Sequence, residues 1–454
     1  MRTPRRVRTC PKAGHEAKNE APRARPALRA GLPAAALLVA VMIPALPLIA
    51  QEDGGIELRA TLTQRFERLT NASLDPDSDG TTLRSNTGLG FVLTSGTRLD
   101  RVTLGFGGSL RRVDAPLDVD STDFGFESPY ANLRYARSVG DASFETGIGV
   151  NVEDISYLES LGLTIVETDT DTDTVDDTPV VDLDERYGTG TRRRIRADAA
   201  LRFGIDGPAE LGLFANVHSI RYSDAGSSSE DSDSYGLRGL LSLALAPDLT
   251  LDGGLGYSQF RNDSDGQRDT WTMNLALARS LPRGTLSTSV RLTQTEDGTR
   301  STAGLGWVQP LPEGSARASI GLTRATNGDL GLSGALHWDR SLPEGDVSAS
   351  LGHGYAANDD DRETMYTNAA LSLSRPLTRL TSLDLGVAYV QNEIVDTDTS
   401  NRQGEISAGI SHQLGHDWSL GAGYRHIERR ENDADWAGSD NLYLSIGRSF
   451  SVRY

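Results

Sequence analysis

The chain has 454 residues, of which 37% are hydrophobic, 24% are charged and 48 are glycine, and its formal net charge is −18. A soluble protein of this length normally buries a larger apolar core, whereas a β-barrel in lipid needs apolar side chains on only one face of each strand. Beyond residue 50, no stretch approaches the roughly 20 apolar residues of a transmembrane helix.

Charge and cysteine are distributed unevenly along the chain. Residues 51–454 carry 36 basic and 61 acidic side chains, a net charge of −25, and every basic residue among them is arginine. Such acidity argues against nucleic acid as a partner. The only cysteine, Cys10, lies in the first 50 residues, which excludes a disulfide, a cysteine zinc site or thiol catalysis in the remainder.

Residues 1–50 have the composition of a targeting segment. A basic stretch precedes an apolar run over 32–49, which three prolines interrupt, and Ala50 places a small residue at a cleavage position before Gln51. A membrane anchor is the alternative, but the prolines and the lack of a basic stop after Ala50 count against it. We therefore predict a signal segment over 1–50 and a single barrel domain over 51–454.

From Ile56 onward, apolar residues occupy every second position, which is typical of strands with one apolar and one polar face. The pattern is clearest over 269–355, where three nearly identical turns at 280–285, 310–315 and 341–346 recur every 30 or 31 residues. This repeat is that of a two-stranded hairpin. It predicts a transmembrane antiparallel up-and-down β-barrel.

The strand number follows from the connections. We identify nine tight turns and ten longer, mostly acidic connections, which join about 20 strands (18–22). An even number with short periplasmic turns and longer extracellular loops is the pattern of bacterial outer-membrane barrels. The longer connections are predicted at 67–81, 112–122, 155–190, 223–233, 261–268, 295–300, 325–328, 357–362, 392–402 and 430–439.

Several aromatic residues occupy the same alternate positions as the apolar residues, and they lie at similar distances from the tight turns. Four tyrosines lie about ten residues beyond a tight turn, a rise of about 25 Å for a tilted strand, which is the height of the lipid-facing band. Three tryptophans lie close to a tight turn. We predict two membrane girdles, formed by Tyr257, Tyr355, Tyr389 and Tyr424 and by Trp307, Trp338 and Trp418.

The C-terminal segment alternates up to a terminal aromatic residue. Phe450, Val452 and Tyr454 resemble the signal that outer-membrane barrels present to the barrel assembly machinery. Arg448 falls on the same lipid-facing alternate positions, where a charge is costly. The sequence offers only a bulge or an upward-reaching side chain to account for it.

The inward positions are predicted to be mostly small, for example Thr272, Asn274, Ser348 and Ser350. A barrel of about 20 strands is too wide for side chains to fill. Few residues separate Gln51 from the first strand, so we expect no N-terminal plug domain. An open or loop-narrowed channel is then the physical expectation.

One inward patch and one loop have unusual charge. Arg192, Arg194, Arg196 and Arg202 alternate with apolar residues, and the preceding loop 155–190 is strongly acidic. The pair resembles, in outline, the general porins, in which an acidic loop folds into the lumen opposite an arginine cluster. The alternative is a solvated external loop. The predicted constriction comprises these arginines with Asp169, Asp171, Asp173, Asp176 and Asp177.

Other chemistry finds little support. Asp75, Asp77 and Asp79 open a calcium-loop pattern, but Asn86 stands where an EF-hand needs a glutamate, so only weak ion association is predicted. The histidines are scattered, and no Ser/His or Asp/His pair lies at a convincing height for a hydrolase. We predict no enzyme activity and no cofactor.

The targeting segment, the hairpin repeat, the girdles and Tyr454 resemble Gram-negative outer-membrane β-barrels over about 56–454, and within them loosely defined porin-like families, some linked to exopolysaccharide export. The resemblance is architectural. It implies an outer-membrane location, contact with lipid and lipopolysaccharide, and a passive channel for small hydrophilic solutes. An export conduit for a polymer and a non-conducting surface barrel remain alternatives, and oligomeric state is open.

Overall fold

The chain divides into two units, Met1–Ala50 and Gln51–Tyr454. A computed structural model describes most of the second unit and no residue of the first. Outside the described residues lie 1–54, 73, 75, 77–79, 115–123, 156–189, 224–229, 263–265, 358–362, 396, 398, 416, 433 and 454.

The described residues form twenty β-strands, each antiparallel to the next, as predicted from the alternation of the sequence. The first ten are β1 (Gly55–Thr70), β2 (Thr81–Gly96), β3 (Asp100–Asp114), β4 (Phe124–Val139), β5 (Ala142–Asp154), β6 (Thr191–Phe203), β7 (Ala209–Ser223), β8 (Ser232–Ala246), β9 (Leu249–Asn262) and β10 (Gly266–Leu281). The others are β11 (Gly284–Thr295), β12 (Gly298–Leu311), β13 (Gly314–Arg324), β14 (Leu330–Leu342), β15 (Gly345–Ala357), β16 (Glu363–Pro376), β17 (Thr381–Ile394), β18 (Ser400–Gln413), β19 (Trp418–Glu431) and β20 (Ala437–Arg453).

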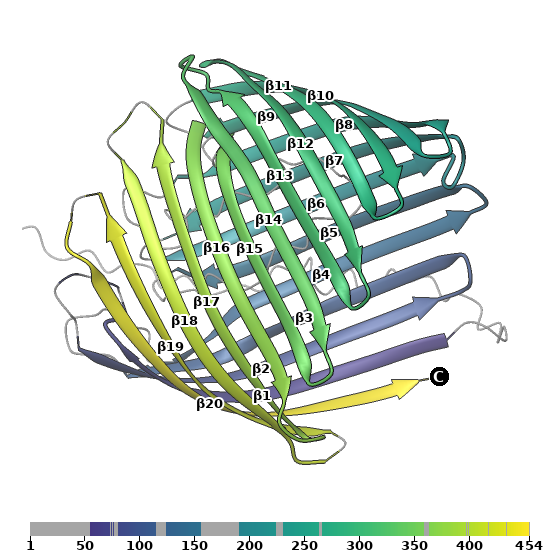
Figure 1. Cartoon of the computed structure of the whole chain (residues 1–454). Coiled ribbons are helices and arrows are strands. Elements are labelled where there is room, and N and C mark those ends of the chain that lie inside the picture. Colours follow the sequence, from purple (N-terminus) through teal and green to yellow (C-terminus); the bar gives the residue numbers. More distant parts are fainter. Residues whose placement is uncertain are drawn as a thin grey trace, which may run out of the picture. The chain divides into compact units, whose positions relative to one another are not determined.

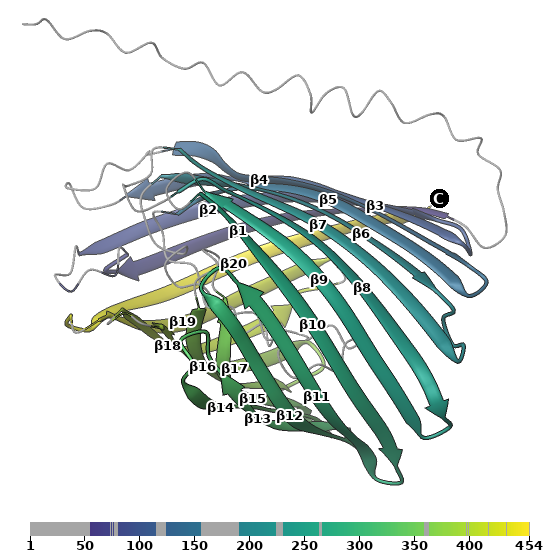
Figure 2. The same cartoon turned by 90° about the horizontal axis from the view of Figure 1, so that it is seen from above.

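The sheet closes on itself. β20 pairs with β1 from Glu57–Arg453 to Leu69–Asn441, so the last strand lies beside the first, as the yellow and purple strands show (Figure 1, Figure 2). Closure leaves the described strands without a free edge, which a hydrocarbon environment requires. The described residues include no helix that is both long enough and apolar enough to span a bilayer.

Alternation gives the barrel an apolar outer face. On β10, the side chains of Trp271, Met273, Leu275 and Leu277 are 59, 51, 48 and 37% exposed. The register places Met273 between Leu255 of β9 and Leu292 of β11. An apolar surface that surrounds a closed barrel is stable against lipid rather than water. Following the usual arrangement of bacterial barrels, we call the ends with tight turns periplasmic and the opposite ends extracellular.

The three similar turns at 280–285, 310–315 and 341–346, which we call the Leu-Pro turns because each contains Leu followed by Pro, share one backbone feature. Each ends in a glycine with positive φ: Gly284 at 152°, Gly314 at 151° and Gly345 at 135°. A Cβ at any of these positions would collide with a carbonyl oxygen of the neighbouring strand. Glycine is therefore required there by both conformation and space.

Several extracellular connections are shorter than predicted, and the one predicted at 295–300 is the shortest. Instead of a loop over 295–300, Thr295 pairs directly with Gly298, and only Glu296 and Asp297 lie between β11 and β12. The Asp-Gly step is a hairpin signal, because glycine accepts the positive φ, here 144°, that such a turn needs. The wall at β11 to β13 therefore has a low extracellular rim.

The register places all seven predicted girdle aromatics on the outer face. Tyr257 also packs against Trp271 at 4.8 Å between ring centroids. Three of the four tyrosines donate their hydroxyl to a polar group on the same face: Tyr257 to Asp269, Tyr389 to Gln391 and Tyr424 to Asp440. The outer surface thus turns polar just beyond the tyrosines, while the depth of the girdles in a bilayer stays a prediction.

Candidate functional site

The candidate site is the wall of the lumen, formed by the strand face opposite to the apolar one. Arg192, Arg194, Arg196 and Arg202 alternate on β6 with Ile195, Ala197 and Leu201, and the register pairs these apolar residues with outer-face residues of β5 and β7. The four arginines therefore occupy the lumen face. The acidic residues proposed to oppose them lie within 156–189, outside the described residues.

Arg192 is the most enclosed of the four arginines, with 1% of its surface exposed. It stands opposite Glu153 of β5, and its Nη2 lies 2.7 Å from Glu153 Oε2. Further down the strand, Arg196 Nε lies 3.5 Å from His218 Nε2, and the Arg202 guanidinium lies 5.6 Å from the Phe214 ring centroid. Polar and aromatic neighbours from β5 and β7 thus hold these side chains along the wall.

A second charged group lies on β3, β4 and the end of β5. Arg111 forms ion pairs with both Glu127 and Asp154, and only 7% of its surface is exposed. Ile155, the residue after Asp154, donates its amide to the carbonyl of Gly190 at 3.0 Å. The extracellular ends of β5 and β6 are therefore joined by main-chain and ionic contacts.

A third charged group crosses the seam between β20 and β1. Glu67 accepts hydrogen bonds from Arg65 at 2.8 Å and from Arg84 of β2, and only 6% of its surface is exposed. The Arg65 guanidinium lies 4.0 Å from the centroid of the Tyr443 ring on β20. On the next wall, Glu405 of β18 pairs with Arg425 of β19 at 3.1 Å. No motif in the sequence marks Glu67, Glu405 or their partners, although alternation along the strands places each of them on the lumen face.

Exposure of the lumen face changes along the barrel axis. On β1, Thr61 and Thr63 are exposed, whereas Glu67 and Leu69 nearer the extracellular end are buried. On β18, Gln413 is exposed at the periplasmic end. Asn401, Gln403 and Glu405 at the other end are 7, 0 and 2% exposed. On these two strands, the lumen-facing side chains are exposed near the periplasmic end and buried near the extracellular end.

Charge is also unequal around the lumen. On the described lumen-facing positions of β6 to β13, nine arginines face three carboxylates, and we call this surface the basic wall. Its arginines are Arg192, Arg194, Arg196, Arg202, Arg238, Arg268, Arg291, Arg300 and Arg317, and its acids are Asp198, Glu210 and Asp252. On β14 to β20, Asp339, Asp346, Asp384, Glu405 and Glu431 outnumber Arg425, Arg429 and Arg453.

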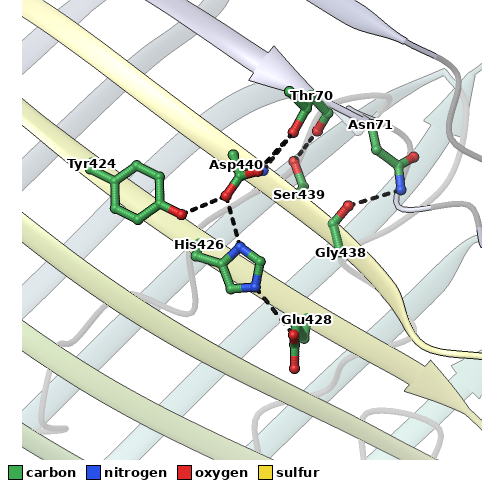
Figure 3. A network of polar contacts seen from close by, with 8 residues as sticks. All are labelled: Thr70, Asn71, Tyr424, His426, Glu428, Gly438, Ser439 and Asp440. Atoms are coloured by element: carbon green, nitrogen blue, oxygen red, sulfur yellow. Dashed lines mark hydrogen bonds and ion pairs between the residues drawn. The ribbon is translucent and has the colours of Figure 1, made fainter.

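A separate polar network joins β19, β20 and β1 at the extracellular end, mainly on the outer face (Figure 3). Asp440 Oδ1 accepts the Tyr424 hydroxyl at 2.5 Å and lies 2.9 Å from His426 Nδ1, whose Nε2 lies 3.2 Å from Glu428. The amide of Asp440 donates to Thr70 Oγ1 at 2.9 Å. This network continues the β1–β20 pairing beyond its last main-chain partners.

The described residues contain no group of three or more His, Cys, Asp or Glu side chains arranged to hold a metal ion. Asp75, Asp77 and Asp79, where weak ion association was predicted, lie outside the described residues, as does Tyr454. Phe450 and Val452 lie on the outer face of β20, opposite Ala60 and Leu58. Their role in assembly stays a prediction.

No family model and no curated protein matches the sequence. Among solved structures, the ferric enterobactin receptor PfeA of Pseudomonas aeruginosa is similar at 10% identity and a TM-score of 0.50, over 87% of this chain and 80% of the receptor. The channel OccK5 of the same organism gives 14% identity and 0.39 over 88% and 99% of the two chains. The channel DcaP of Acinetobacter baumannii gives 10% and 0.37 over 88% and 99%. The fold of this chain is that of the Gram-negative outer-membrane β-barrel proteins.

Proposed function

We propose that the protein is a porin-like channel of the outer membrane, through which small hydrophilic solutes pass passively. The main support for this channel is the combination of a closed barrel of twenty strands with a polar, charged lumen wall. A barrel of this width is too large to be filled by its own wall side chains. Near the periplasmic end, the lumen-facing residues Thr61, Thr63 and Gln413 are exposed and polar, which suits a water-filled path.

The narrow part of this channel is proposed to lie in the extracellular half. Support comes from the buried lumen side chains there, among them Arg192, Gln403 and Glu405. The arginines of the basic wall in that half would give the passage a positive potential on one side, which a low local dielectric strengthens. On the opposite side, Glu405 and Glu431 are balanced by Arg425 and Arg429. The proposal includes a contribution of the acidic loop 155–190 to this constriction.

Solute passage can be tested by the swelling of liposomes that contain the purified protein. Liposomes in an isotonic solution of a pentose or hexose should swell, and those in a solution of a large oligosaccharide should not. Equal, background swelling in every solute would contradict the channel and favour an export conduit that needs a partner, or a non-conducting surface barrel. No catalytic role is part of the proposal.

A further inference from the structure

Arg448 of β20 stands on the outer face of the barrel. The register places it opposite Leu62 of β1 and opposite Trp418, the first residue of β19 after a periplasmic turn. A charge facing lipid costs about 2–4 kcal/mol at the bilayer midplane and about 0–1 kcal/mol near the interface. Its position beside Trp418 puts Arg448 near the periplasmic interface, where a charged group and headgroups can meet.

Two aromatic rings hold the Arg448 side chain. Its guanidinium carbon lies 5.0 Å from the ring centroid of Trp418 and 4.2 Å from that of Phe450. The Nε atom is buried and has no hydrogen-bond partner among the described residues, while the two terminal nitrogens are not buried. Stacking on aromatic faces leaves the in-plane N–H donors of a guanidinium available to an external acceptor.

Three other outer-face arginines near the periplasmic rim have acidic partners, whereas Arg340 of β14 has none among the described residues. Arg137 lies 3.7 Å from Asp100, Arg279 lies 3.1 Å from Asp248, and Arg375 pairs with Glu344. Arg448 forms neither a hydrogen bond nor an ion pair with any described residue, the nearby Asp417 included. The terminal nitrogens of Arg448 are therefore available to an acceptor from outside the described chain.

We propose that Arg448, Trp418 and Phe450 bind the phosphate of an anionic phospholipid in the periplasmic leaflet. The guanidinium fork matches phosphate oxygens, and its aromatic neighbours fix its direction. Farther up the same face, Leu420, Leu444 and Ile446 are 37, 49 and 37% exposed and provide an apolar track for an acyl chain. An anionic headgroup is favoured over a zwitterionic one because it brings no ammonium group to the cation.

The site can be tested by native mass spectrometry of the full chain, purified in detergent, stripped of lipid and titrated with phosphatidylglycerol or phosphatidylethanolamine. The wild type should retain phosphatidylglycerol preferentially, and Arg448→Gln should weaken this retention about tenfold, as expected for a charge-assisted contact. Arg279→Gln is the matched control, because Arg279 lies on the outer face near the same rim but pairs with Asp248. It should behave as the wild type does.

Equal retention by Arg448→Gln and the wild type would overturn the site. Equal retention of the two lipids by the wild type would also overturn it, and this comparison needs no variant to fold. Displacement of the lipid by an equal concentration of inorganic phosphate would show a phosphate site rather than a lipid site. Arg448→Lys keeps the charge without the planar fork, so its retention should lie between those of the wild type and Arg448→Gln.

Discussion

Arg192 of β6 and Glu153 of β5 occupy directly opposed positions on the lumen wall, with Arg192 Nη2 2.7 Å from Glu153 Oε2. The pair lies at the extracellular end of β6, where main-chain and ionic contacts join β5 to β6. Arg192 is the only buried arginine among the four of the predicted constriction, and this pair links it to the neighbouring strand. Its loss should therefore affect both stability and the shape of the passage.

Replacing Arg192 by Gln should lower the free energy of unfolding by about 1–3 kcal/mol, because the charge-assisted contact between the buried Arg192 side chain and the half-buried Glu153 is lost. The measurement is the urea midpoint of unfolding in detergent, followed by the electrophoretic shift of folded barrels. Arg193→Gln is the control, since Arg193 is exposed on the outer face of the same strand. Equal midpoints for the two variants would show that the pair contributes no stability.

The basic wall should bias ion permeation. Replacing Arg238 and Arg291, which face the lumen from β8 and β11, by Gln removes two positive charges from it. The reversal potential in a tenfold salt gradient should shift toward cation selectivity by on the order of 10 mV, where ideal selectivity gives about 59 mV. Arg261→Gln, on the outer face of β9, should leave it unchanged. A shift of equal size in the control would contradict a role of the lumen wall.

The polar network around Asp440 should hold the seam between β20 and β1 closed at its extracellular end. Thr70→Val keeps the side-chain shape but removes the oxygen that accepts the amide of Asp440. The loss of about 1 kcal/mol should accelerate hydrogen exchange of the adjoining β1 and β20 amides roughly fivefold. Thr63→Val, at an exposed lumen position of β1, is the control. Unchanged exchange in Thr70→Val would mean that the main-chain ladder alone secures the seam.

The Leu-Pro turns should tolerate no side chain at their final glycine. Gly345→Ala forces a Cβ onto the carbonyl oxygen of Ser374 at a φ of 135°, a strain of about 1–3 kcal/mol. We expect a lower urea midpoint and slower refolding into detergent micelles. Gly404→Ala, where a Cβ meets open space, should change neither. Wild-type behaviour of Gly345→Ala would show that the turn can rearrange at little cost.

Much of this fold could be predicted from the sequence, because one physical rule governs every strand. In a barrel with lipid outside and a polar lumen inside, side-chain polarity alternates with period two, so parity alone gives the face of Tyr257 or Arg194. The strand number follows in the same way from the turns between alternating segments. The connection between Thr295 and Gly298 is shorter than its polar composition predicts, because the Asp-Gly step forms a two-residue turn.

Contacts between strands could not be predicted in the same way. Glu405 and Arg425 are twenty residues apart, and their ion pair depends on the register of β18 against β19, which parity leaves undetermined. Glu363, at the start of β16, accepts a hydrogen bond of 2.7 Å from the amide of Thr326, which lies between β13 and β14. Alternation alone places Arg448 beside Phe450 on one face of β20, but only the register of β19 against β20 places Trp418 opposite Arg448.

The central claim is that the lumen conducts, and single-channel recording of the full-length protein in a planar bilayer tests it most directly. Insertion is verified beforehand by the electrophoretic shift of the folded barrel, so that silence cannot be ascribed to missing protein. We predict discrete ohmic current steps whose selectivity changes when Arg192, Arg194 and Arg196 are replaced by Ala. Complete absence of current from verified, inserted protein would contradict the channel.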